Sequence, residues 1–223
     1  MDRVLEKVTA FITSGEGAET RLLLFEHPTT GIQIPAGTVE DAESHVEAAL
    51  REAMEESGLT DLEVCKCIGF ADTQLPDDQY AILNKTKVYA RPNRTSFDWA
   101  EFRRGVLCAC TRQENDFLLL TYTEYDRYRD PQYVTYSITG WVPSDMVTQR
   151  QRRYYYHLVY KGDSADTWIQ FSDHHDFRPF WALLTDLPKI IAPQRAWLDY
   201  VTQELGYQFG VVGRTQDSSL RSE

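Results

Sequence analysis

The sequence predicts an α+β protein in which a small all-β unit interrupts a sheet that carries one well-marked helix. Residues 8–70 combine strand-like runs with a single amphipathic helical pattern, whereas residues 87–147 contain only short strand-like runs between turn residues. The chain has 223 residues, of which 42% are hydrophobic. This length fits one large domain, or a medium domain with a smaller companion, and the apolar content is enough for a proper core.

The N-terminal part is expected to begin with strands. Runs of β-branched and large apolar residues bounded by turn residues are typical of strands. The predicted strands are Val8–Thr13 and Arg21–Phe25, which form a hairpin, followed by Ile32–Pro35 and Leu62–Phe70.

One helix is predicted from His45 to Ser57. Ser44 and Glu47 have the spacing of a capping box, in which each side chain satisfies a backbone amide at the start of a helix. Apolar residues recur inside the segment at helical spacing, so one face can pack on a sheet. Gly58 is suited to the left-handed conformation that ends many helices.

The rest of the chain is expected to be mainly β-structure. The predicted strands are Val88–Ala90, Val106–Thr111, Phe117–Thr121, Tyr133–Ile138, Gly140–Pro143, Tyr154–Tyr160, Trp168–Ser172 and Phe177–Trp181, with a hairpin between the strands at 154–160 and 168–172 and a final helix over Gln194–Leu205. Evenly spaced short strands in the middle of the chain indicate a small barrel.

The formal net charge of −11 argues against two classes of partner. A field of this sign repels nucleic-acid backbones and anionic membranes, so we expect neither as the main partner. A phosphorylated small molecule can still bind if a bound cation reverses the local field. Met1–Gly15 lacks the pattern of a signal peptide, and no apolar run approaches the length of a membrane span, which leads us to expect a cytoplasmic protein.

Three acids on the predicted helix carry the chemical signal. Glu52, Glu55 and Glu56 are spaced i, i+3 and i+4, so their carboxylates lie on one flank, where they repel one another unless a cation binds among them. A Glu-rich helical face alone is usually just solvated. The longer string is more specific: Gly37 is followed by five residues and Glu43, then seven residues and Arg51-Glu52, and Glu55-Glu56-Ser57-Gly58-Leu59 ends it.

This string resembles the Nudix box of the Nudix hydrolase superfamily at every charged and glycine position, although Ala53 is smaller than the family's usual aliphatic residue. The resemblance implies an α/β/α sandwich with a mixed sheet, in which the box binds a divalent cation, Mg²⁺ or alternatively Mn²⁺, and the diphosphate of the substrate. By position, the resemblance assigns Gly37, Glu52, Glu55 and Glu56 as metal ligands and Glu43 with Arg51 as an ion pair that holds the loop against the helix.

The proton acceptor of the reaction is left open by the sequence. Glu55 or Glu56 could accept the proton of an attacking water. Members of this superfamily sometimes use an acid from a distant loop, and Asp173 and Asp176 are our candidates for such a group, near the substrate. Ordinary solvation of a hairpin is the alternative for both.

The middle segment resembles a bacterial Src-homology-three-type barrel, on the motifs 88–92, 104–106 and 138–143. The predicted organisation is therefore a Nudix domain in two parts, residues 1–84 and 150–206, with a barrel inserted over 85–149 and a disordered tail over 207–223. The barrel could be a lid or a partner-binding module. We expect most of its aromatic residues to pack its own core instead: Phe97, Trp99, Tyr122, Tyr125, Tyr128, Tyr133 and Tyr136.

The sequence thus predicts a metal-dependent pyrophosphohydrolase. It would cleave a phosphoanhydride bond in a small nucleotide-type molecule, such as a nucleoside triphosphate or a nucleotide sugar, and could act as a homodimer. Two alternatives belong to other classes: a catalytically silent Nudix fold that senses nucleotides or binds proteins, and a peptide- or glycan-binding protein built on the barrel.

Overall fold

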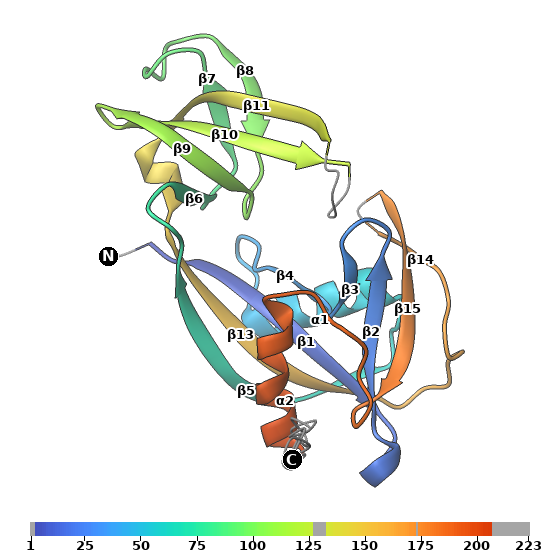
Figure 1. Cartoon of the computed structure of the whole chain (residues 1–223). Coiled ribbons are helices and arrows are strands. Elements are labelled where there is room, and N and C mark those ends of the chain that lie inside the picture. Colours follow the sequence, from blue (N-terminus) through green and yellow to red (C-terminus); the bar gives the residue numbers. More distant parts are fainter. Residues whose placement is uncertain (1–2, 127–132, 173, 207–223) are drawn as a thin grey trace, which may run out of the picture.

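The computed structural model describes residues 3–126, 133–172 and 174–206, which form two sheets and two α-helices (Figure 1). The first sheet has eight strands in the order β14-β15-β2-β1-β13-β5, with β3 beside β2 and β4 beside β1. These strands are β1 (Leu5–Ser14), β2 (Arg21–His27), β3 (Gly31–Gln33), β4 (Ala36–Thr38), β5 (Leu62–Gln74), β13 (Arg150–Tyr160), β14 (Gln170–Ser172) and β15 (His175–Leu183). Strands β1 and β13 are parallel and their neighbours antiparallel, so the predicted mixed sheet is confirmed.

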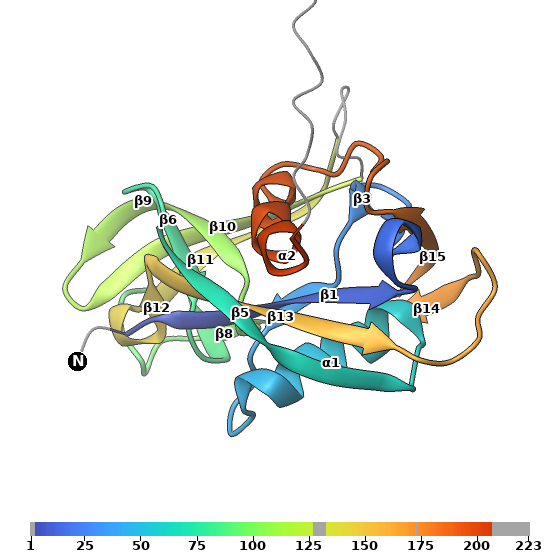
Figure 2. The ribbon, with the colours of Figure 1, turned by 90° about the horizontal axis from the view of Figure 1, so that it is seen from below.

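Helices α1 (His45–Ser57) and α2 (Leu198–Glu204) cover opposite faces of this sheet, and Figure 2 shows one on each side. Side chains alternate along β1: Val8 packs in one cluster with Ala49 of α1, whereas Phe11 packs with Leu198 and Val201 of α2. This arrangement gives the expected α/β/α layers. No helix in the described ranges is both long and apolar enough to cross a membrane.

Helix α1 has the predicted ends. The Ser44 hydroxyl accepts a hydrogen bond from the Glu47 amide, and the Glu47 carboxylate accepts one from the Ser44 amide at 2.9 Å. Gly58 adopts a φ of 74° and donates its amide to the Met54 carbonyl at 2.8 Å. A cap of this kind stabilises a helix by about 1 kcal/mol, so local sequence is sufficient to fix where α1 begins and ends.

The second sheet is entirely antiparallel and curled, in the order β12-β6-β9-β10-β11-β7-β8. Its strands are β6 (Gln79–Ile82), β7 (Thr86–Tyr89), β8 (Asp98–Phe102), β9 (Leu107–Glu114), β10 (Phe117–Tyr125), β11 (Val134–Pro143) and β12 (Val147–Thr148). The sheet has a core of its own that includes Ile82, Val88 and Leu120. A separate all-β unit is therefore present, while closure into a barrel stays a prediction.

Several elements differ from the sequence predictions. Strand β6 belongs to the second sheet although it precedes residue 85, and β8 was missed because most of its residues are exposed and show no apolar alternation. Strand β14 pairs with β15, so the predicted hairpin between β13 and residues 168–172 is wrong. The tail 207–223 lies outside the described residues.

The expectation that most of the seven named aromatic residues pack the core of the second sheet is also wrong. Tyr122 packs against the core, but five of the other rings are exposed: Phe97, Trp99, Tyr125, Tyr133 and Tyr136. Tyr128 lies outside the described residues. The interior is filled mainly by aliphatic side chains and Phe102, and a smaller buried cluster contains Tyr89, Phe117 and Trp141.

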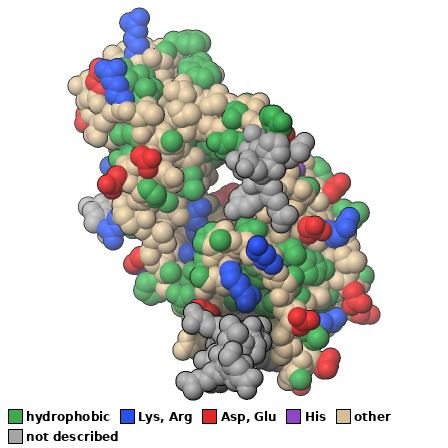
Figure 3. All heavy atoms as spheres, viewed as in Figure 1, with side chains coloured by type: hydrophobic (Ala, Val, Ile, Leu, Met, Phe, Trp, Pro, Cys, Tyr) green, Lys and Arg blue, Asp and Glu red, His purple; other side chains and the backbone are tan. Residues whose placement is uncertain are grey.

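The two sheets are joined by packing and by hydrogen bonds, which include those of Arg3 and Arg104. Leu5 of β1 is fully buried in a cluster with Ala81 and Leu83 next to β6. Arg104, which follows β8, donates from Nε to the Val39 carbonyl of the first unit at 2.8 Å. Figure 3 shows the molecule hollowed between its two parts, with Lys and Arg side chains along the hollow.

Candidate active site between the two sheets

A pocket of about 620 Å³ lies between the box segment and the second sheet. One wall comes from β4, the following loop and α1, and the other from the turns before β7 and β9. The residues that line it are Ala36, Gly37, Thr38, Glu40, Asp41, Arg51, Glu52, Glu55, Glu56, Lys85, Arg103, Arg104, Gly105 and Val106. The acids predicted to bind metal therefore face one cavity, and residues of the second sheet help to enclose it.

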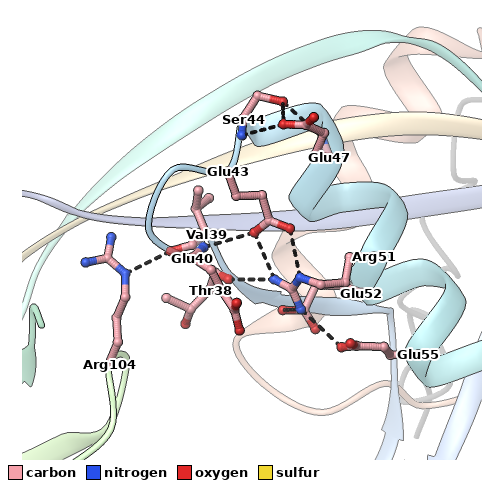
Figure 4. A network of polar contacts seen from close by, with 10 residues as sticks. All are labelled: Thr38, Val39, Glu40, Glu43, Ser44, Glu47, Arg51, Glu52, Glu55 and Arg104. Carbon is pink, nitrogen blue, oxygen red and sulfur yellow. Dashed lines mark hydrogen bonds and ion pairs between the residues drawn. The ribbon is translucent and has the colours of Figure 1, made fainter. Parts of the chain in front are cut away.

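Arg51 is the centre of the first wall (Figure 4). Its Nε and one Nη2 hydrogen reach the two Glu43 oxygens at 2.8 and 3.1 Å. Nη1 donates to Glu52 and Glu55 at 2.9 and 3.1 Å, and Nη2 also donates to the Thr38 carbonyl at 3.0 Å. A guanidinium has five N–H donors, and all five are used here. Arg51 therefore holds the loop and the helix together and has no donor left for a ligand.

The carboxylates around Arg51 are shielded from water. The side chains of Glu43 and Glu52 are 14% and 13% exposed. Hydrogen bonds from Arg51 hold the pKa of Glu43 below its ordinary value, and Glu43 in turn raises the pKa of Arg51. Because shielded charges are costly without partners, this network stabilises the loop that carries Glu43, next to Gly37 in β4.

Gly37 and Glu52 are in close approach. A Cβ atom at position 37 would overlap the Glu52 carboxylate, so only glycine fits there without movement. The Glu56 carboxylate accepts a hydrogen bond from the adjacent Ala36 amide at 2.9 Å. Two of the three helical acids are thus fixed against β4, which explains why the box needs glycine at this position.

The acids are not assembled into a ready-made ligand cage. Among the described residues, no three His, Cys, Asp or Glu side chains gather closely enough to hold a metal ion. The reason is that Arg51 bridges Glu52 and Glu55, while Glu56 turns toward Ala36. The available donors are nonetheless hard oxygens beside a glycine backbone, the kind of ligand that Mg²⁺ and Mn²⁺ take. The donor chemistry fits such an ion, and the carboxylates would have to move to surround it.

The acids proposed from outside the box are not brought to the pocket. Asp176 is an exposed residue of β15, paired with Phe171 of β14, and it is not among the residues that line the cavity. Asp173 lies outside the described residues. Their assignment to the substrate site remains a prediction from the sequence.

Basic residues near the acids were missed by the sequence analysis. Arg153 of β13 is half-buried, stacks over Trp197 at 4.2 Å and donates to the Val8 carbonyl at 2.7 Å. Its register partner Lys7 is half-buried, and burial together with Arg153 lowers the pKa of Lys7 to about 8, against an opposing effect of Glu52. Only the alignment of β1 with β13 reveals this pair, because 146 positions separate Lys7 and Arg153 in sequence.

One family model matches the part of the chain that contains the box. Residues 5–96, from β1 to the loop before β8, match the NUDIX domain family model. An Ap4A hydrolase from C. elegans is 14% identical over 91% of this chain and 98% of its own, with a TM-score of 0.44. A UDP-X diphosphatase (14% identity, 92% and 66% coverage, TM-score 0.42) and the E. coli dihydroneopterin triphosphate pyrophosphohydrolase (14%, 90% and 94%, TM-score 0.40) are similar at the same level. Among curated proteins, none matches the sequence.

Proposed function

We propose that this protein is a divalent-metal-dependent pyrophosphohydrolase that cleaves a phosphoanhydride bond in a small nucleotide-type molecule. The observation that carries the proposal is the arrangement of Gly37, Glu52 and Arg51 in one pocket. The glycine backbone and the Glu52 carboxylate meet there, and the fully engaged guanidinium binds this carboxylate and the carbonyl of the next residue, Thr38. The NUDIX match over residues 5–96 supports it.

Glu52, Glu55 and Glu56, with the backbone at Gly37, would hold Mg²⁺ or Mn²⁺. The ion, when bound, neutralises diphosphate oxygens and makes a water more acidic. Arg51 has no donor to offer the substrate, so its part is to position the loop and Glu52.

Glu55 is the best-placed proton acceptor within the box. Its side chain is 53% exposed, and within the described part of the chain only its Oε2 atom has a hydrogen-bond partner, Arg51. Glu56, by contrast, is already engaged by the Ala36 amide. In the proposed reaction, water attacks phosphorus and passes a proton to Glu55, and the anhydride P–O bond breaks to release the second phosphate group.

One observation favours a second candidate, a catalytically silent module that binds nucleotides. Arg51 pairs with two of the three acids, Glu52 and Glu55, and its positive charge offsets their mutual repulsion without a metal ion. In that case ligand binding would survive removal of metal and no phosphate product would form.

Turnover with a panel of compounds tests the proposal. Nucleoside triphosphates, nucleotide sugars, dinucleoside polyphosphates and coenzyme A derivatives would be incubated with the full chain and Mg²⁺, Mn²⁺ or EDTA, and phosphate-bearing products would be followed by phosphorus NMR. We expect hydrolysis of at least one class, and complete loss of it in EDTA. No product from any class with either metal would refute the proposal.

A matched pair of variants on α1 identifies the acid involved. Glu55→Gln should lower turnover by about 100-fold or more, since it removes a ligand and the proton acceptor together. Glu47→Gln removes the same charge from the same helix but leaves a residue that still suits the capping box, so turnover should stay within about twofold. Both proteins should melt within about 2 °C of the wild type. Full activity of Glu55→Gln would remove this residue from the mechanism.

A further inference from the structure

The second wall of the pocket is held in place by Arg104. Besides the Val39 carbonyl at 2.8 Å, its guanidinium contacts the Leu83 carbonyl and the Asn84 side chain, the latter at 3.3 Å. Its side chain is 20% exposed. These contacts tie the turn after β8 to the loop after β4, so the two walls keep a fixed relation.

Gly105 lets this turn approach the box loop closely. It has a φ of 86°, which glycine adopts readily, and a Cβ atom there would lie 2.6 Å from the Thr38 hydroxyl oxygen. Thr38 is also the residue whose carbonyl binds Arg51. The turn 103–106 is thus packed against the segment that carries Gly37.

Arg103 occupies the rim of the pocket in this turn. It lines the cavity and is exposed, and within the described part of the chain its guanidinium has no hydrogen bond or ion pair. Lys85 lines the same wall and pairs with Glu101 at 2.6 Å, with both side chains well exposed. An exposed pair of this kind is weak and can be exchanged for another anion.

We propose that Arg103, with Lys85 beside it, binds a phosphate group of the ligand across the pocket from the helical acids. Its five unused donors suit phosphate oxygens, which a guanidinium can bind in a bidentate manner. The identity of the ligand as a polyphosphate rests on the proposed function. The second sheet is then part of the substrate site, and the phosphate chain bridges the two walls.

The charges and shape of the pocket support this role. Five carboxylates and four cationic side chains line it. A dication held by the acids would therefore leave the pocket positive, although the whole chain carries a net charge of −11. None of the described lining residues is aromatic, so this cavity offers phosphate contacts and no ring on which a base could stack.

Binding of imidodiphosphate, an analogue whose P–N–P link resists hydrolysis, tests the proposal without measuring turnover. Calorimetric titrations would be done in Mg²⁺ with wild type, Arg103→Ala and Arg91→Ala. Arg91 is the matched control: it is exposed on the same unit, its side chain has no partner in the described ranges, and it does not line the pocket. Arg103→Ala should weaken binding about tenfold or more, and Arg91→Ala less than about twofold.

The salt dependence gives a second readout. The slope of log Kd against log salt concentration should be shallower for Arg103→Ala than for wild type, because one cation no longer contacts the phosphates. Thermal melting of each variant verifies that it is folded. Equal affinities of wild type and Arg103→Ala would overturn the proposal, as would a wild type that does not bind imidodiphosphate at all.

The same proteins separate this inference from the proposed function. A wild type that hydrolyses a compound of the panel, with an Arg103→Ala variant that binds imidodiphosphate unchanged, would refute the inference alone. If the wild type hydrolyses none of the compounds but binds imidodiphosphate in a way that depends on Arg103, the proposed enzymatic function is refuted and the phosphate-binding role of Arg103 is supported.

Discussion

Two arginines line the same pocket and differ in every respect that matters for binding. All five N–H groups of the Arg51 guanidinium donate hydrogen bonds to protein acceptors, and its side chain is 25% exposed. Arg103 stands on the opposite wall, exposed and without a polar partner in the described ranges. The comparison shows that an arginine near phosphate-handling acids is not thereby a phosphate ligand: its donors must be free.

The difference follows from where the two residues sit. Arg51 belongs to a helix packed on the sheet, and its acidic partners come from its own helix and from the loop eight residues earlier. Arg103 sits in a turn whose contacts with the first unit are made by the next two residues, Arg104 and Gly105. The wall formed by the box segment is therefore assembled around Arg51, whereas the wall formed by the second sheet leaves Arg103 exposed to the cavity.

Replacement of Arg51 should have the largest effect on stability. Arg51→Met leaves the shielded carboxylates of Glu43 and Glu52 without their cation, and we expect unfolding free energy to fall by about 2–4 kcal/mol in chemical denaturation. Arg94→Met is the control, because Arg94 pairs with Asp145 on the surface, where both side chains are more than half exposed; it should cost less than about 1 kcal/mol. A similar loss of unfolding free energy in the two variants would mean that the Arg51 network stabilises the fold no more than an exposed ion pair does.

The pH dependence of Arg51→Met sharpens this test. The folded-state pKa of Glu43 is lowered, so its stabilising contribution is present above the ordinary value of 4.5 and is lost as pH falls through the lowered pKa. The stability gap between wild type and Arg51→Met should therefore shrink below about pH 4.5. A gap that stays constant or widens on acidification would contradict the role of this ion pair.

A methyl group at Gly37 should have an intermediate effect. Gly37→Ala places a Cβ atom in the Glu52 carboxylate, and a clash of this size in a packed site costs about 1–3 kcal/mol. The cost should fall by about 1 kcal/mol or more in a Glu52→Ala background, where the clash is gone. Denaturation of the four proteins of this cycle measures the coupling, and additive losses would show that the glycine is not needed for the close approach.

Replacement of Lys7 should have the smallest effect and the opposite sign. Its folded pKa of about 8 lies below the ordinary 10.5, so the folded state carries the full cost of the charge below pH 8 and is relieved of it as pH rises toward 10.5. In EDTA at pH 7, Lys7→Met should be more stable than wild type by about 1 kcal/mol, because the half-buried lysine keeps part of its hydration, and the advantage should vanish near pH 10.5. A less stable Lys7→Met at pH 7 would show that Glu52 relies on this lysine.

The sequence predicts the wall of the pocket formed by the box segment much better than the wall formed by the second sheet. Helix α1, its caps and the pairing of Arg51 with Glu43 follow from residues within about fifteen positions of one another, where spacing on a helix decides which side chains meet. The proximity of Gly37 and Glu52 is consistent with the box pattern, which assigns both residues to one metal site. Neither the bridge from Arg51 to Glu55 nor the turn of Glu56 toward Ala36 was expected, because competition among several acids for one guanidinium depends on precise rotamers.

By itself, the sequence determined the box helix and the presence of a separate all-β unit, since each depends on periodicity and capping along a short stretch of chain. The mixed sheet was expected only from the family resemblance, because its parallel pair joins the distant strands β1 and β13. The tertiary structure alone decided that residues 103–106 face the acids, that Lys7 lies beside Arg153, and that rings such as Phe97 and Trp99 of the second unit are exposed. These results depend on how segments dozens of residues apart pack together, and no local pattern encodes which side of a sheet or turn will meet a distant partner.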